Sequence, residues 1–371
     1  MRKTGSTVLP LHGGYAPAWL IKRMRKLSDE IVFIITEEYG SKEFLRKLSD
    51  PYWFQAFGCV LGFDWHSSGL TTVVTRILKD VLSIEKHGMV VAGGKGKASR
   101  RVQIELEELG NSIGLSESKI EQLRYASRMS AKVDTAAIQA GYPIYHHSIF
   151  VLETSDWAVI QQGINVNEKK ARRSHWLSES IEDFIVEPHD SIVGEPHDSV
   201  LNMTSMDVEE CRRTSVDIAK GDTNNLISSI RKIGSESEVL DTWIEGTSFS
   251  KRYHSYEMPT NLNWKIFKSI YDVQPRNYEE LLALKGIGPA TIRALALVSQ
   301  LIYGKEACWD DPVKFSYAIG GKDGVPYPVD KKAMDEAISF LREITSSIDV
   351  EYNEKKNALN SLGRLSKTWG L

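Results

Sequence analysis

The fold of the C-terminal part is decided by the segment Leu281-Leu282-Ala283-Leu284-Lys285-Gly286-Ile287-Gly288-Pro289-Ala290-Thr291-Ile292-Arg293-Ala294. Apolar positions at helical spacing flank a turn with two glycines, which predicts two helices within residues 278–303. Glycine lets the backbone approach another molecule closely, and proline is tolerated in a first helical turn, where its missing N–H would have no partner. This pattern predicts a helix-hairpin-helix element.

The second helix of this element would present unpaired backbone N–H groups at its N-terminus, where anions bind. We expect the anion to be a DNA phosphate, with structured RNA as the alternative polymer. The predicted contacts are Lys285, Gly286, Ile287, Gly288, Ala290 and Thr291. The hairpin is also a candidate site for a monovalent cation, and no other cofactor is expected. An ordinary helical hairpin with a glycine cap is the alternative.

Two aspartates, Asp310 and Asp311, follow Gly288 by 22 and 23 residues. This arrangement resembles the DNA glycosylase superfamily that combines a helix-hairpin-helix, a Gly/Pro-rich loop and an aspartate. The resemblance implies that one carboxylate supports the cationic sugar as the base leaves, as in glycoside cleavage. Bifunctional members carry a lysine where this chain has Ala290, which implies a monofunctional enzyme or a lyase lysine elsewhere. Helix capping before Pro312 is the alternative role.

Other candidate side chains lie in two loops. Lys322, in a glycine-rich loop, is a candidate phosphate contact or Schiff-base amine, with a plain surface turn as the alternative. Asp64 and His66 are acid/base candidates, and Trp65 between them is a candidate platform for an unpaired base. For these residues, a helix cap above an aromatic core is the alternative.

Two short basic clusters add candidate phosphate contacts. The first follows a glycine-rich turn and contains Lys95, Lys97 and Arg100; the second contains Arg172 and Arg173, followed by Trp176 as a second stacking candidate. Such clusters suit phosphate contacts, although a solvated charged face is the alternative.

A wider resemblance rests on segments 11–17, 62–69, 93–96, 171–176 and 317–331. Together they look like an uncharacterised, mainly archaeal and thermophile family with the helix-hairpin-helix in its C-terminal part. This resemblance covers nearly the whole chain and implies no reaction.

The predicted fold is predominantly helical, with an α+β domain over 1–200, a polar linker over 201–225 and an all-α domain over 226–371. A β-hairpin is expected near 147–164. After Asp183 the regular spacing of apolar residues fades. In this region the segment 187–191, Glu-Pro-His-Asp-Ser, recurs at 195–199. This repeat is interpreted as a duplication in an exposed loop, and no metal site is predicted at its histidines.

Length, amino-acid composition and net charge limit the classes of function that this chain can have. A chain of 371 residues with 42% hydrophobic residues can build two domains, and its formal charge of −3 gives no global attraction for nucleic acid. Three scattered cysteines, no apolar stretch of membrane length and no signal-like start predict a cytoplasmic, nucleoid-associated protein.

Three functions follow as hypotheses. The leading one is a DNA repair glycosylase that excises a modified base. The second is a structure-specific nuclease that needs Mg²⁺, for which the candidate ligands are Asp64, Asp310, Asp311, Asp323 and Asp330. The third is a DNA-binding module without catalysis.

Overall fold

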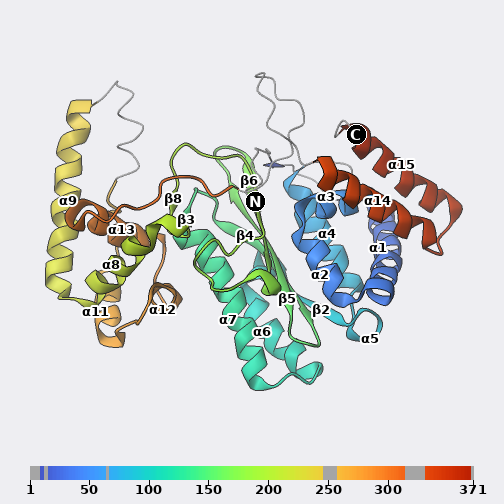
Figure 1. The fold of residues 1–371 in the computed structure, drawn as a ribbon, viewed down its shortest axis with the longest axis horizontal. Coiled ribbons are helices and arrows are strands. Elements are labelled where there is room, and N and C mark those ends of the chain that lie inside the picture. The colour runs from blue at the N-terminus through green and yellow to red at the C-terminus, as the bar shows by residue number, and fades with distance from the viewer. Residues whose placement is uncertain (1–8, 12–15, 64–66, 245–256, 314–330, 369–371) are drawn as a thin grey trace.

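The computed structural model describes residues 9–11, 16–63, 67–244, 257–313 and 331–368 (Figure 1). An antiparallel sheet stands in the middle of the molecule, and helices cover both of its faces. The fold is thus α+β and mainly helical, as predicted.

The central sheet has six strands in the order β1-β6-β5-β4-β2, with β7 paired to β6. The strands are β1 (Leu9–Pro10), β2 (Met89–Lys95), β4 (Ile144–Leu152), β5 (Trp157–Asn165), β6 (Lys170–Leu177) and β7 (Ser191–Val193). Strands β4 and β5 form the β-hairpin expected near 147–164. A second, two-stranded sheet pairs β3 (Ile138–Gln139) with β8 (Leu201–Asn202).

One face of the central sheet packs on helices from both ends of the chain. These are α1 (Ala18–Tyr39), α2 (Ser41–Ser49), α3 (Pro51–Val60), α4 (Ser68–Val81), α5 (Ile84–His87), α14 (Lys331–Ser347) and α15 (Tyr352–Thr368). Successive residues of a strand point to opposite faces, so Phe150 and Ile160 join this core. Helix α3 starts where the Asp50 carboxylate accepts hydrogen bonds from the N–H groups of Tyr52 and Trp53.

The opposite face packs on a second core. Its helices are α6 (Lys97–Ser112), α7 (Glu117–Lys132), the π-helix η1 (Val133–Ala137), α8 (Glu209–Lys220), α9 (Thr223–Ile244), α11 (Trp264–Val273), α12 (Tyr278–Ala283) and α13 (Pro289–Tyr303). Two 3₁₀ turns, η2 (Ser178–Ser180) and η3 (Met206–Val208), complete the elements. Ile149 and Val159 of the sheet share this core with Leu281 and Ile292 of α12 and α13.

The structure corrects the predicted domain boundaries. Residues 201–225 are no polar linker, because they form β8, η3 and α8, and Cys211 and Val216 are buried. Residues 226–371 are no single domain either, because α14 and α15 pack on α3 in the first core. The first copy of the repeat packs into the fold, since His189 is 5% exposed, whereas Pro196, Asp198 and Ser199 of the second copy are exposed, as expected.

Two further findings concern the cysteines and the helix lengths. The cysteines Cys59, Cys211 and Cys308 are free thiols. Within the described ranges, none of the helices has the length and apolar character to cross a membrane.

Candidate functional site

The turn between α12 and α13 exposes its main chain. Lys285, Gly286 and Pro289 are exposed, and Gly286 has a φ of 91°, in the region that favours glycine. A Cβ atom built on Gly288 would meet no atom of the described part of the chain within 4 Å. The two helices expected within 278–303 are confirmed as Tyr278–Ala283 and Pro289–Tyr303.

Among the described residues, no side chain caps the N-terminus of α13. Its N-cap, Gly288, makes no capping side-chain hydrogen bond, and the first turn carries no acidic residue. The first N–H groups of an α-helix have no partner within the helix, so those of Ala290 and Thr291 face the turn. Ile287 and Thr291 are themselves buried and anchor the turn.

A segment of the second core holds this turn from below. Lys132, the last residue of α7, donates hydrogen bonds from Nζ to the carbonyls of Leu282 (2.6 Å) and Leu284 (2.5 Å). Gln139 Nε2 donates to the carbonyl of Pro289 at 2.8 Å. Burial, and then the charge of Arg128, lower the pKa of Lys132 to about 8.

The π-helix η1 between Lys132 and Gln139 carries a buried carboxylate. Asp134 has a side chain only 8% exposed, paired with His189 and hydrogen-bonded to Gln161 Nε2. Burial would raise its pKa, but the charge and hydrogen bond of His189, with those from Ser174 and Gln161, lower it overall. Asp134 is therefore ionised at neutral pH. Such π-helical turns are frequent at functional sites.

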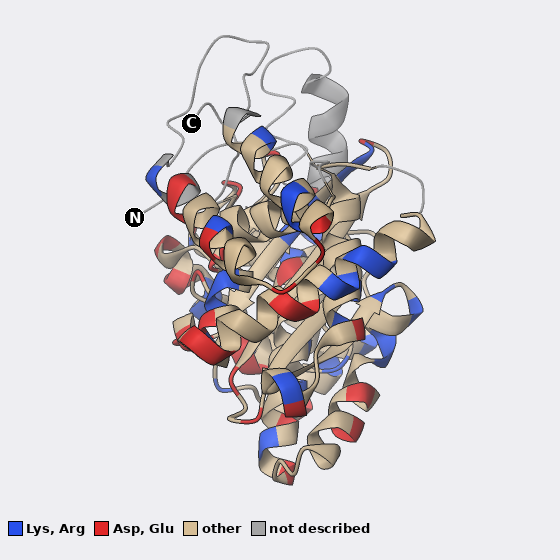
Figure 2. Cartoon of the chain, turned by 90° about the vertical axis from the view of Figure 1, so that its right-hand side faces the viewer, with Lys and Arg blue, Asp and Glu red and all other residues tan. Residues whose placement is uncertain are grey.

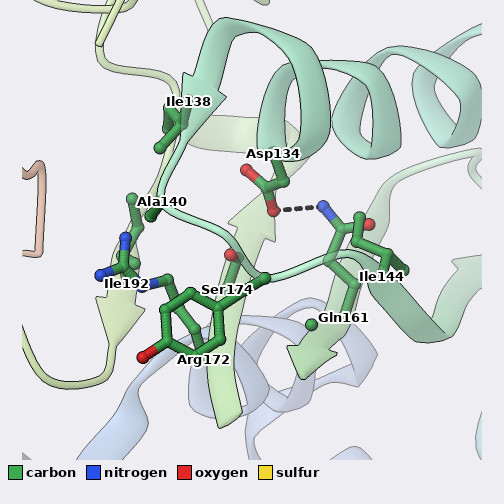
Figure 3. A pocket seen from close by; sticks show the side chains of 10 residues that line it. Asp134, Ile138, Ala140, Ile144, Gln161, Arg172, Ser174 and Ile192 are labelled. Carbon is green, nitrogen blue, oxygen red and sulfur yellow. Dashed lines mark hydrogen bonds between the residues drawn. The ribbon is translucent and has the colours of Figure 1, made fainter. Parts of the chain in front are cut away.

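A small cavity opens beside Asp134 (Figure 3). Its volume is about 20 Å³, enough for about one water molecule. Asp134 and Gln161 lie on one side and Arg172 on another, and Ser174 also lines it. The Nε of Arg172 is buried and has no hydrogen-bond partner among the described residues. The cavity is thus lined by an anionic side chain and by an arginine with one N–H group unpaired among the described residues.

The predicted catalytic aspartates, Asp310 and Asp311, do not line this cavity. Asp311 has a side chain 2% exposed and forms a bidentate pair with Arg172, at 2.9 and 2.5 Å. It also accepts hydrogen bonds from the N–H groups of His197 (2.8 Å) and Val313 (3.2 Å). Asp311 therefore serves as an anchor for Arg172, because every oxygen is engaged inside the protein. Asp310 is exposed.

The second basic cluster is corrected, because its side chains are buried in β6. Arg172 is 6% and Arg173 0% exposed, so neither guanidinium lies on a phosphate-binding surface. Arg173 donates to His175 Nε2 at 2.8 Å and lies over the ring of Phe54. Trp176 is 0% exposed and packs against His189, so it offers no face to a base.

The first basic cluster is exposed, as expected. Lys95, Lys97 and Arg100 surround the glycine-rich turn that leads from β2 into α6. Nζ of Lys95 lies 5.8 Å from the ring centre of Tyr145. Phosphate contacts from these side chains stay a prediction.

Several predicted residues lie outside the described ranges: Asp64, Trp65, His66, Lys322, Asp323 and Asp330. Among the residues that the structure does describe, no group of three His, Cys, Asp or Glu side chains is placed to hold a metal ion. Asp134 and Lys132 were not predicted from the sequence, because they stand in an ordinary helical pattern. The repeat that contains His189 was the one available signal for this site.

Comparison with known proteins gives one match. A family model described as protein of unknown function (DUF763) matches residues 5–329. No curated protein and no solved structure matches the chain.

Proposed function

We propose that this chain, which belongs to the family described as protein of unknown function (DUF763), binds the sugar-phosphate backbone of DNA at the turn between α12 and α13. The observation that carries the proposal is the open main chain at Gly288, where a Cβ would meet no atom of the described residues within 4 Å. A glycine with such free space is not required by packing. It leaves room for an outside group to approach the backbone.

The electrostatics of the turn favour an anion. The N-terminus of α13 carries the positive end of the helix dipole, and no acidic side chain in the first turn opposes it. Lys132 adds a positive charge below the turn, and Lys285 adds another on its surface. A phosphate is the anion of this charge and size that recurs along DNA.

A second contact surface is proposed at Lys95, Lys97 and Arg100. Because the net charge of the chain is −3, attraction must come from such local clusters. Figure 2 shows Lys and Arg mixed with Asp and Glu along the helices of the side viewed. Binding is therefore expected to be modest and sensitive to salt.

The reaction that we propose is excision of a modified base, with Asp134 as the carboxylate in place of Asp311. Asp134 lies on η1, which packs against α13, so a nucleotide held at the turn would be close to it. In the proposed step, water adds to C1′ of the sugar, the C–N bond breaks, and the base leaves with the proton from water. The anionic Asp134 would stabilise the positive charge on the sugar, as carboxylates do in glycoside cleavage.

The size of the cavity limits this step. About 20 Å³ accommodates a water molecule and no base, so the sugar would approach the mouth of the cavity. The unsatisfied Nε of Arg172 is a donor that could hold the water there.

The test uses duplexes that each carry one modified base, incubated with the protein in EDTA, treated with alkali and separated on a denaturing gel. Anisotropy measures binding of the same duplexes. We expect cleavage at one modified base, lost in Asp134→Asn while binding persists. Asp310→Asn, which changes an exposed aspartate next to the pair-forming Asp311, is the matched control and should behave as wild type.

Each other outcome has a distinct meaning. Nicking that requires Mg²⁺ would favour the nuclease, and binding without any product would leave a DNA-binding module. Loss of activity in Asp310→Asn but not in Asp134→Asn would contradict the assignment of Asp134. Failure to bind any duplex would contradict the whole proposal.

A further inference from the structure

The carbonyls at the C-terminal end of α12 accept hydrogen bonds from a lysine of another helix. The carbonyls of Leu282, within α12, and of Leu284, its C-cap, both accept hydrogen bonds from Lys132 Nζ, at 2.6 and 2.5 Å. The last carbonyls of a helix lack partners within it and carry the negative end of its dipole. Two such oxygens that converge on one point form a small site for a cation.

We infer that Lys132 Nζ is the built-in cation of this hairpin, so that the turn holds its DNA-binding shape without a free monovalent ion. The inference deepens the proposed function and rests on it for the part that concerns DNA. It replaces the expectation of a free monovalent cation at the hairpin, because the ammonium already occupies the place between the two carbonyls.

The charge of Lys132 is not neutralised by an acid. Among the described residues, none of the ion pairs includes Lys132, and the only charged side chain found to affect its pKa is the like-charged Arg128. A second cation beside Nζ would add repulsion in a half-buried site. One fixed charge therefore orders the turn and also attracts an anion to its open side.

The position of Lys132 links the turn to the cavity. Asp134 follows Lys132 by two residues, and η1 continues to Gln139, which donates to the carbonyl of Pro289. A change at Lys132 would thus alter the turn first and the carboxylate second. Lys132 is a positioning residue in this account, since it contacts main chain and no substrate.

The experiment compares wild type, Lys132→Ala and Lys268→Ala in K⁺ and in tetramethylammonium at equal ionic strength. Lys268 is an exposed lysine on the neighbouring helix α11, so it controls for the loss of one charge. Three readouts are taken: hydrogen exchange of residues 282–291, duplex binding by anisotropy, and binding of Tl⁺, a K⁺ surrogate, by ²⁰⁵Tl NMR.

Wild type and Lys268→Ala should show no difference between K⁺ and tetramethylammonium in exchange, and no bound Tl⁺. Lys132→Ala should exchange faster at 282–291 and bind duplex about tenfold more weakly in tetramethylammonium, since a charged hydrogen-bond donor is lost. K⁺ should restore part of both, and Tl⁺ should bind, because the ammonium no longer occupies the place between the two carbonyls; that of Leu284 keeps only the hydrogen bond from the N–H of Ile287 at 3.3 Å.

Specific Tl⁺ binding to wild type at the hairpin would overturn the inference, and this arm needs no variant to fold. Behaviour of Lys132→Ala that matches Lys268→Ala in exchange and Tl⁺ binding would also overturn it. If no protein binds duplex while Lys132→Ala gains K⁺-dependent protection, the inference about the hairpin holds and the proposed function fails.

Discussion

Two glycine-rich turns open long helices in this protein, and their surroundings differ. Gly93 to Gly96 lead from β2 into α6, while Gly286 to Gly288 lead from α12 into α13. In the first turn, a Cβ on Gly93 would lie 2.1 Å from the carbonyl oxygen of His147. In the second, a Cβ on Gly288 would meet nothing within 4 Å. A Cβ on Gly96, the N-cap of α6, would also meet no described atom within 4 Å, but its φ of 62° favours glycine by itself. Packing thus requires glycine at position 93 and backbone conformation favours it at position 96, whereas neither does so at position 288, where φ is −142°.

Each turn also has an internal lysine on a main-chain carbonyl. Lys79 Nζ donates to the carbonyl of Gly93 at 2.7 Å, but it also pairs with Glu105 at 2.6 Å. Glu105 in turn accepts from the N–H of Gly93 at 2.8 Å. Lys132 has no such acidic partner among the described residues. The internal charge of the first turn is neutralised, and that of the second is left to act on an anion.

The largest effect should follow a substitution in the first turn. Gly93→Ala places a Cβ against the backbone of β4 and forces a φ of 93° on a residue that disfavours it. We expect a loss of about 3 kcal/mol or more in the free energy of unfolding, measured in urea. A loss below about 1 kcal/mol would mean that Gly93 is not required by packing, and the comparison would break.

The next largest effect should come from acid, which should lower the free energy of unfolding through His146, beside the first turn. His146 pairs in register with Lys95, is 1% exposed, and has a pKa lowered to about 3 by burial, then by His147 and Lys95. The unfolded chain takes up this proton near pH 6.5 and the folded chain does not, so stability falls as pH drops below about 6.5.

From pH 7 to 5 the expected loss from His146 is about 2 kcal/mol. Urea unfolding at both pH values measures it, and His146→Gln should reduce the difference by that amount. An unchanged pH dependence in His146→Gln would show that His146 is not the titrating group.

The second turn should respond in binding and not in stability. Gly288→Ala fits the free space, so the free energy of unfolding should change by less than about 1 kcal/mol. Duplex affinity should fall about tenfold, or about 1.4 kcal/mol, because the Cβ blocks the approach of a phosphate.

Gly363→Ala is the control for this variant. Gly363 lies in α15 and also has nothing within 4 Å of its Cβ position, with no positive φ. Its duplex affinity should equal that of wild type. Equal affinity in Gly288→Ala as well would remove the distinction between the two turns.

The smallest effect is expected from the exposed cluster at the first turn. If Lys95, Lys97 and Arg100 each contact a phosphate, alanine at any one of them should reduce the slope of log affinity against log salt by about 0.9. Titrations at several salt concentrations measure this slope. Unchanged slopes in all three variants would confine DNA to the second turn.

The local elements of this fold could be predicted from the sequence. The turn chemistry of Gly286 to Pro289 and the apolar spacing around it located both helices of the hairpin. Two apolar runs, 149–152 and 157–160, on either side of a polar turn located β4 and β5. These features depend on residues close together in the chain, so a local pattern can show them.

Long-range packing could not be read in the same way. Arg172 and Asp311 are 139 residues apart and look like surface charges in sequence, yet they meet in the core. Strand β6 has Arg173 and His175 at positions facing one core, so its alternation did not indicate burial on both faces. Asp134 gains its partners from β5, β6 and the loop that holds His189, which no spacing in the sequence brings together.

The most direct test of the central claim is hydrogen exchange of the intact protein with and without an unmodified duplex at low salt. We predict protection of the N–H groups at Gly288, Ala290 and Thr291. The N-terminus of α1 also lacks a side-chain cap and an acidic residue in its first turn, and it should show no protection. Bound duplex that leaves residues 288–291 unprotected would contradict the account.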